Sequence, residues 1–226
     1  MSYEATRSRV ETYFDRTATD VWARLTSDAP VSGIRRTVRA GRDRMRAVML
    51  SRLPQDLNGM RVLDAGCGAG QMSVALAERG ARVMAVDISP ALIEVARERL
   101  PAHLQGNVTF RAGDMLDPAL GDFDHVVAMD SLIYYDAAEI GSALAALGAR
   151  VRGRIVLTVP PRTTMLMAMW GAGRLFPRSD RSPVMVPQRT EALARAARRA
   201  GALGNLSEIE RVNSGFYIST CLEYSS

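Results

Sequence analysis

Between residues 60 and 159 the chain alternates short apolar segments with longer amphipathic ones, and this alternation limits the possible folds more than any other feature. The apolar segments are MRVLDA, RVMAVD, NVTFRAGD, DHVVAMD and RIVLTVP, and helical patterns such as QMSVALAERG and AAEIGSALAALGARV lie between them. Strands joined by helices form parallel sheets that are covered on both faces. The alternation therefore predicts an α/β fold with a mostly parallel sheet and helices on both faces.

The segments on either side of this region differ from it. Residues 1–55 have helical periodicity, with a break at TSDAPVSG (26–33), and predict a helical arm before a main domain at 56–226. Residues 160–188 contain five prolines and follow a strand's carboxyl end, where open α/β sheets bind ligands. We interpret them as a lid insertion; a helix packed on the core is the alternative. A helix and two strand-like segments close the chain.

Composition excludes several classes of protein. With 226 residues, 47% of them hydrophobic, the chain suits one compact domain. Two cysteines do not make a disulfide framework or a zinc site, and they favour a reducing cytoplasm. No apolar run approaches the ~18 residues of a membrane span. The net charge of +5 suits a nucleic acid, an anionic small substrate or an anionic membrane surface.

An arginine stripe follows the break in the arm. Arg35, Arg39, Arg42 and Arg46 are spaced i, i+4, i+7 and i+11, which places them along one side of a helix. This side is either a solvated charged face or a surface turned toward an anion or a partner.

The stretch DAGCGAG (64–70) joins the first predicted strand to a helix. The dinucleotide fingerprint G-x-G-x-x-G fails here, because its third glycine falls on Gln71. Asp64 before the turn disfavours a pyrophosphate and favours a cationic ligand. The stretch resembles the first motif of class I methyltransferases, whose S-adenosylmethionine carries an ammonium and a sulfonium. Its expected cofactor-binding residues are Asp64, Gly66, Cys67, Gly68 and Gly70.

Two more carboxylates end strands. Asp87, followed by Ile88, ends the second strand and is placed to bind the two ribose hydroxyls, a device that NAD sites share. Asp114 ends the third strand, and in class I methyltransferases this position contacts the adenine amino group, with the neighbouring Met115 against the ring. Together with the glycine turn, these residues predict an S-adenosylmethionine site; helix caps around a tight turn are the alternative.

MDSLIYYD (129–136) follows the fourth strand. In this fold it places Asp130, Ser131, Tyr134 and Tyr135 beside the sulfonium. The stretch lacks the Asn/Asp-Pro-Pro-aromatic motif common in nucleic-acid amine methyltransferases. We therefore expect no nucleic-acid partner.

The motifs together resemble the magnesium-protoporphyrin IX O-methyltransferase family, in its purple-bacterial branch of bacteriochlorophyll synthesis. The matching pieces span nearly the whole chain: YF (13–14), DVW (20–22), VRAG (38–41), DAGCGAG, VDIS (86–89), MDSLIYYD, GRLFP (173–177) and NSGFYIS (213–219). The resemblance implies a Rossmann-like class I methyltransferase fold with a seven-stranded sheet. Chloroplast and cyanobacterial members have a His at the position of Tyr134 and a Tyr at the position of Thr26. Both are candidate active-site groups in those members, so neither active-site role transfers unchanged to this chain.

The resemblance implies methylation of the 13-propionate of magnesium-protoporphyrin IX. A propionate is ionised at neutral pH, since its pKa is about 4.3, and needs no general base. We expect Tyr134, Tyr135 and Arg39 to act on the substrate, with Arg39, or alternatively Arg162, binding the second propionate. Tyr134 is a candidate ligand, direct or through water, of the substrate's magnesium, and no metal site of the protein's own is expected. His103 and His125 are expected to be structural or solvent-facing.

The resemblance also implies contact with magnesium chelatase and with a membrane surface, which makes the expected location cytoplasmic with peripheral membrane association. Two other functions stay open. One is methylation of a different carboxylate or phenol, such as a quinone precursor. The other is a catalytically silent module that binds S-adenosylmethionine.

Overall fold

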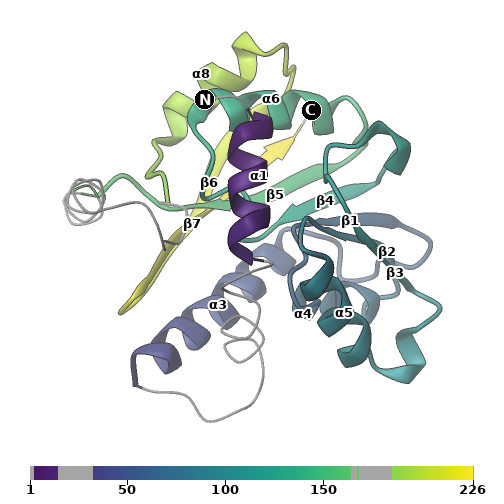
Figure 1. The fold of residues 1–226 in the computed structure, drawn as a ribbon. Coiled ribbons are helices and arrows are strands. Elements are labelled where there is room, and N and C mark those ends of the chain that lie inside the picture. Colours follow the sequence, from purple (N-terminus) through teal and green to yellow (C-terminus); the bar gives the residue numbers. More distant parts are fainter. Residues whose placement is uncertain (1–2, 15–32, 164–166, 168–184, 226) are drawn as a thin grey trace.

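The computed structural model describes residues 3–14, 33–163, 167 and 185–225, and its core is one seven-stranded sheet (Figure 1). The strands are β1 (Arg61–Ala65), β2 (Arg82–Asp87), β3 (Val108–Ala112), β4 (His125–Ala128), β5 (Arg154–Val159), β6 (Asn205–Ser214) and β7 (Tyr217–Ser225). The α-helices are α1 (Tyr3–Tyr13), α3 (Gly33–Ser51), α4 (Gln71–Ala77), α5 (Pro90–Arg99), α6 (Ala137–Gly148) and α8 (Thr190–Arg199). Short 3-10 helices span Ala102–Leu104 and Pro118–Leu120.

The strand order is β3-β2-β1-β4-β5-β7-β6. Strands β1 to β5 pair in parallel, whereas β7 runs antiparallel to both β5 and β6. The predicted α/β fold with a mostly parallel seven-stranded sheet is confirmed. Because β1 pairs with β2 on one side and β4 on the other, the order of strands reverses at β1, and open sheets bind ligands at such a switch point.

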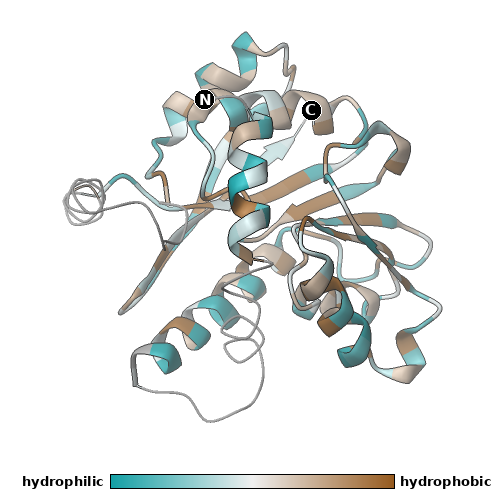
Figure 2. Ribbon diagram, in the orientation of Figure 1, coloured by the Kyte–Doolittle hydropathy of each residue, from teal (hydrophilic) through white to brown (hydrophobic). Residues whose placement is uncertain are grey.

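Two hydrophobic clusters cover the two faces of the sheet. One cluster joins α1, α6 and α8 to the strands, with Val10, Leu144 and Leu193 among its buried members. The other joins α3, α4 and α5, with Met45 and Leu76 buried in it. Figure 2 shows the central strands as mostly hydrophobic and the helices as mixed, as expected of helices that each bury one side.

Local sequence explains where the helices begin. The Ser89 side chain accepts a hydrogen bond from the Leu92 amide, and Pro90 occupies the first helical position of α5. In α6, Asp136 and Glu139 form a reciprocal capping box. Glu139 also accepts a hydrogen bond of 2.8 Å from Thr6, which ties α1 to α6.

The described parts of the predicted arm are α1 and α3. Most of the predicted lid at 160–188 lies outside the described residues, as does most of the break predicted at 26–33; at the two ends of the lid, Pro161 and Gln188 form a parallel bridge. Within the described ranges, no helix combines the length and apolar character needed to cross a bilayer.

Candidate functional site

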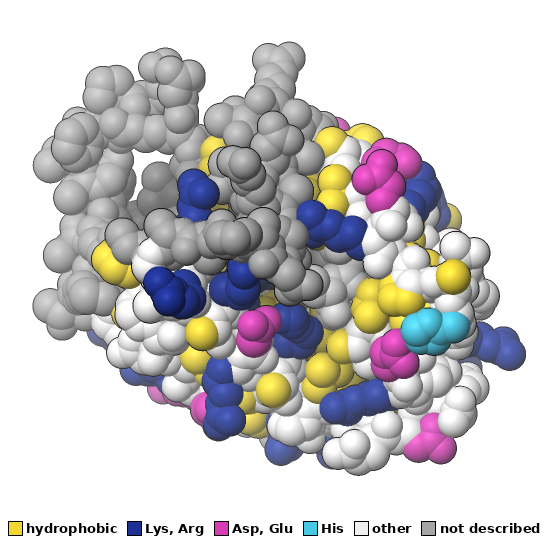
Figure 3. Space-filling model, turned by 90° about the horizontal axis from the view of Figure 1, so that it is seen from below, with side chains coloured by type: hydrophobic (Ala, Val, Ile, Leu, Met, Phe, Trp, Pro, Cys, Tyr) yellow, Lys and Arg dark blue, Asp and Glu magenta, His cyan; other side chains and the backbone are white. Residues whose placement is uncertain are grey.

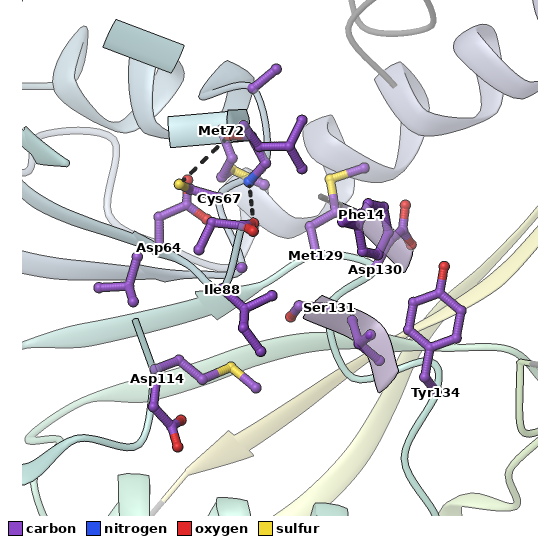
Figure 4. Close-up of a pocket in the computed structure, with 18 of the residues that line it drawn as sticks. Phe14, Asp64, Cys67, Met72, Ile88, Asp114, Met129, Asp130, Ser131 and Tyr134 are labelled. Atoms are coloured by element: carbon purple, nitrogen blue, oxygen red, sulfur yellow. Dashed lines mark hydrogen bonds between the residues drawn. The ribbon is translucent and has the colours of Figure 1, made fainter. Parts of the chain in front are cut away.

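A pocket enclosing about 1020 Å³, open mouth included, lies at the carboxyl ends of β1, β2 and β4. Helix α1, which crosses in front of the sheet in Figure 1, and helix α3 both contribute side chains to its wall, and Figure 4 shows the strand tips that line it. Its walls come from the glycine turn, the strand tips and both N-terminal helices: Tyr3, Arg7, Val10, Phe14, Arg42, Arg46, Asp64, Gly66, Cys67, Gly68, Ala69, Gln71, Met72, Val86, Asp87, Ile88, Leu92, Gly113, Asp114, Met115, Met129, Asp130, Ser131, Tyr134 and Tyr135.

The glycine turn needs glycine for two different reasons. Gly66, Gly68 and Gly70 have φ values of 83°, 53° and 83°, in the left-handed region that side chains disfavour. Gly66 also makes a close approach, because a Cβ there would stand 2.2 Å from the Cβ of Ser131. The first two glycines line the pocket, and Gly70 precedes α4 beneath it.

Asp64 at the end of β1 is 1% exposed. Burial raises its pKa to about 7, although a 2.6 Å hydrogen bond from the Ser73 hydroxyl favours the ionised form. A carboxyl group that titrates near neutrality gains from a cationic neighbour, because the cation repays part of the cost of burying the charge. Asp64 is therefore suited to a cationic ligand.

Asp87 at the end of β2 organises the turn. One carboxylate oxygen accepts a 2.8 Å hydrogen bond from the Gly68 amide, and the other accepts a 2.9 Å bond from the Ser89 amide. Asp87 both shapes the glycine turn and lines the pocket.

Asp114 at the end of β3 is held by α1. Its carboxylate accepts hydrogen bonds of 2.7 Å from the Tyr3 hydroxyl and 2.9 Å from Arg7. The Tyr3 ring stacks on Tyr135, with centroids 5.1 Å apart. Helix α1 therefore bridges the β3 end and the β4 end of the pocket. Met115, next in the chain, is buried in the pocket wall.

Asp130 follows β4 and has a φ of 57°. Among the described residues other than glycine, it alone has a positive φ. Its carboxylate forms an ion pair with Arg42 and accepts 3.0 Å hydrogen bonds from the hydroxyls of Thr158 and Tyr217. The neighbouring Ser131 Oγ is buried and has no hydrogen-bond partner among the described residues.

Two tyrosines complete the wall beyond Ser131. Tyr134 is 8% exposed and meets the Phe14 ring edge-on, with centroids 6.2 Å apart (Figure 4). Burial raises the pKa of the Tyr135 hydroxyl well above its ordinary value, and it does the same for the Cys67 thiol. Both groups therefore stay protonated at neutral pH, so Tyr135 is no base and Cys67 no nucleophile.

The residues present fit S-adenosylmethionine. A buried, unpartnered hydroxyl at Ser131 suits a pocket whose ligand supplies the missing partner. The acidic tips Asp64 and Asp87 suit an ammonium and ribose hydroxyls, while Ile88 and Met115 offer apolar walls for a flat ring. Among the described residues, no cluster of three or more His, Cys, Asp or Glu has the arrangement of a metal site.

Both arginines predicted to bind substrate lie outside this wall. Arg39 is half-buried on α3 but is not among the pocket residues, whereas Arg42 and Arg46 of the same stripe are. Arg162 lines a separate polar pocket of about 430 Å³ beside β6. The arginine stripe therefore has two kinds of environment: Arg42 and Arg46 line the pocket, whereas Arg35 is exposed to solvent. A role for Arg39 or Arg162 toward substrate stays a prediction.

The two histidines lie away from the pocket. His103 is exposed and pairs with Glu78 at 2.9 Å. His125 begins β4, where its Nδ1 accepts a 3.1 Å hydrogen bond from the Arg154 amide, and burial lowers its pKa. Cys67 and Cys221 are both free and buried.

Sequence reasoning missed the pocket residues of α1 and the partners of Asp130. Tyr3 and Arg7 belong to no motif quoted above, so no local signal marked them. Tyr217 lies in NSGFYIS, and Arg42 directly follows VRAG; the motifs marked these segments without giving these residues a role. A periodic stripe also does not say which of its arginines faces a pocket.

Comparison with known proteins finds similar methyltransferases. Residues 128–226 match the family model described as "Magnesium-protoporphyrin IX methyltransferase C-terminus", and residues 62–152 match a methyltransferase domain. The magnesium-protoporphyrin O-methyltransferase of Rhodobacter capsulatus is 62% identical over 223 residues, which cover 98% of this chain and 97% of the relative. A Synechocystis protein of the same name is 33% identical over 74% of each chain.

A solved structure of the same enzyme family has a similar fold. The crystal structure of magnesium protoporphyrin IX methyltransferase from Synechocystis, with bound S-adenosylhomocysteine, superposes with a TM-score of 0.80 at 27% sequence identity. The match covers 97% of this chain and 99% of the other.

Proposed function

Because the chain belongs to the magnesium-protoporphyrin O-methyltransferase family, we propose that it transfers the methyl group of S-adenosylmethionine to the 13-propionate of magnesium-protoporphyrin IX. The products are the monomethyl ester and S-adenosylhomocysteine. The observation that carries the proposal is a single pocket in which three acidic strand tips adjoin a wall of tyrosines. The first group suits the cofactor and the second suits a large, flat acceptor.

The cofactor supplies an activated methyl group on a sulfonium, and the chain's residues hold it in place. We assign Asp87 to the ribose hydroxyls, Asp114 and Met115 to the adenine, and Asp64 with the glycine turn to the cationic amino-acid end. Ser131 Oγ donates or accepts the hydrogen bond that the described protein leaves unmade. These assignments are supported by the position of each side chain in the pocket wall.

The reaction needs placement rather than proton removal. A propionate is already ionised at neutral pH. The described pocket wall offers Tyr135 and Cys67 only in protonated form, because burial raises the pKa of both groups. Alignment of the carboxylate with the methyl group supplies on the order of 7–11 kcal/mol in favourable cases. Exclusion of water strengthens the carboxylate as a nucleophile.

The roof formed by α1 serves this exclusion. Tyr3, Val10 and Phe14 turn apolar surface toward the pocket, and the contacts from Tyr3 and Arg7 to Asp114 hold the helix down. We propose that Tyr134, which lines the pocket, approaches the magnesium of the substrate directly or through a water. Arg39 of α3 is the proposed partner of the second propionate, although it lies outside the described pocket wall.

We also propose contact with a membrane surface and with magnesium chelatase, since the porphyrin is poorly soluble. Arg35, Arg36 and Arg44 of α3 are exposed, and the face seen from below in Figure 3 carries several arginines among hydrophobic side chains. Flotation with vesicles of anionic lipid tests the membrane contact. Equal flotation with neutral vesicles would contradict an electrostatic contact.

One incubation tests the proposed activity against its alternatives. Purified protein is given S-adenosylmethionine labelled in the methyl group, together with magnesium-protoporphyrin IX or a phenolic quinone precursor. We expect label in the porphyrin monomethyl ester. Label only in the quinone precursor would favour a different small-molecule methyltransferase, and cofactor binding without any transfer would favour a silent module.

A further inference from the structure

Three sequence motifs that lie far apart in the chain meet behind the pocket. Gly41 ends VRAG and packs on the Tyr217 ring of NSGFYIS, so closely that a Cβ at Gly41 would stand 2.6 Å from Tyr217 Cδ1. Arg42 and Tyr217 then both contact Asp130 of MDSLIYYD. Tyr217 itself is not among the residues that line the pocket. Its hydroxyl is linked to the pocket wall by its hydrogen bond to Asp130.

The backbone of Asp130 has an unfavourable conformation. A φ of 57° lies in the left-handed region, which residues with a Cβ disfavour, Asp less than most, and such a conformation is kept where surrounding contacts support it. Here the contacts are visible. Arg42 of α3, Thr158 of β5 and Tyr217 of β7 hold the carboxylate, and the Asp130 amide donates a 2.8 Å hydrogen bond to Thr158 Oγ1.

The kink at Asp130 determines where the next residues lie. It turns the chain at the end of β4, so that Ser131 lies against Gly66 of the cofactor turn. Ser131 Oγ is buried there without a partner among the described residues, and Figure 4 shows it beside Asp130 at the hollow of the pocket. Tyr134 follows three residues later in the same wall. A change at Asp130 would move both side chains.

We propose that Tyr217 is a positioning residue for methyl transfer: its hydroxyl fixes Asp130 in the left-handed conformation and thereby holds Ser131 and Tyr134 in place. The inference rests on the proposed methyl transfer, because it assigns Tyr217 a role in that reaction. It concerns the hydroxyl and not the ring, whose packing on Gly41 is a separate, structural contribution. Burial and the nearby Asp130 raise the pKa of Tyr217, so the hydroxyl remains a donor.

Tyr217→Phe removes the hydroxyl and keeps the ring. A hydrogen bond to a charged group contributes enough to change an equilibrium by about tenfold or more. We expect kcat to fall at least about tenfold and the Kd for S-adenosylhomocysteine, measured by calorimetry, to rise about fivefold. Tyr224→Phe is the matched control, since Tyr224 is also buried in β7 and its hydroxyl accepts a 2.8 Å hydrogen bond from the Gly204 amide. This control should leave kcat and Kd unchanged.

Variants of Asp130 separate a positioning role of Tyr217 from a general loss of protein stability. Asp130→Gly allows the left-handed conformation without any clamp, whereas Asp130→Ala does not. We therefore expect Asp130→Gly to retain more activity than Asp130→Ala. Adding Tyr217→Phe to Asp130→Gly should change neither kcat nor Kd by more than about twofold, since coupled residues are not additive.

Two results would overturn the inference. One is a Tyr217→Phe protein with the kcat and Kd of the wild type. The other is a full tenfold loss on adding Tyr217→Phe to Asp130→Gly. A wild-type protein that binds S-adenosylhomocysteine but methylates no porphyrin would contradict the proposed function instead. In that case the Kd values of Tyr217→Phe and Tyr224→Phe for S-adenosylhomocysteine would still show whether the hydrogen bond from Tyr217 to Asp130 affects the site.

Discussion

Gly66 and Ser131 touch across the switch point of the sheet: any Cβ at Gly66 would lie 2.2 Å from the Cβ of Ser131. Gly66 follows β1 and Ser131 follows β4, so the contact joins the tips of these two strands. Gly68, two residues on, also has a positive φ but has open space where its Cβ would be. A comparison of the pair Gly66 and Gly68 therefore separates the effect of backbone strain from the effect of crowding against Ser131.

The first prediction uses this pair. Gly66→Ala must both strain the backbone and displace Ser131, whereas Gly68→Ala only strains the backbone. We expect Gly66→Ala to lower the free energy of unfolding by about 1–3 kcal/mol more than Gly68→Ala, in line with the cost of overpacking. Chemical denaturation without ligand measures the difference. Equal loss in the two variants would show that Ser131 moves aside at no cost.

The second prediction concerns Asp87. Asp87→Ala leaves the Gly68 amide and the ribose hydroxyls without their acceptor in a closed site. We expect S-adenosylmethionine binding to weaken by about 2–4 kcal/mol. Calorimetry measures the change, and NADH serves as the control ligand that should not bind. Tight NADH binding by the wild type would contradict the assignment of the glycine turn.

The third prediction concerns pH. Burial raises the pKa of Asp64 to about 7 in the folded protein, against about 3.9 when unfolded. Between pH 4 and 7 the folded state binds more protons than the unfolded state, so the free energy of unfolding should fall as pH rises through this window and level off above it. Denaturation of Asp64→Asn at several pH values should lack this fall. The exposed Glu98→Gln is the control and should keep it.

The fourth prediction concerns the roof. Tyr3→Phe keeps the stacking on Tyr135 and removes the hydroxyl that holds Asp114. Because the bond lost is to a charged group, we expect S-adenosylhomocysteine to dissociate about tenfold faster. Stopped-flow displacement measures the rate, with the exposed Glu4→Gln of the same helix as control. An unchanged rate would mean that α1 opens without breaking this contact.

The fifth prediction concerns the metal of the acceptor. If Tyr134 anchors the magnesium, metal-free protoporphyrin should still bind but turn over at least tenfold more slowly, a loss of roughly 1.4 kcal/mol or more of transition-state stabilisation. Zinc-protoporphyrin should fall between the two. Steady-state rates in one detergent, for the wild type and Tyr134→Phe, decide it. Equal rates with and without metal would leave Tyr134 as a wall of the pocket.

Much of the cofactor site followed from local sequence. A strand that ends in DAGCGAG places Asp64 and the glycines at the tip of β1, and equal reasoning places Asp87 and Asp114 at the next two tips. The carboxyl ends of parallel strands share one edge, so these groups had to converge whatever the details of packing. The five parallel strands and their helices followed from the same alternation.

The contacts that bring helices α1 and α3 to the pocket did not follow from local sequence, because they join residues that are remote in the chain. Asp114 meets Tyr3 across 111 positions, and Asp130 meets Tyr217 across 87. The arginine stripe fixed the spacing along α3 but not the rotation of the helix about its axis. In the structure Gly41 packs on Tyr217, and the side of α3 that reaches the pocket wall carries Arg42 and not Arg39. Periodicity determines which residues share a side of a helix, whereas only its packing against the sheet determines where that side points.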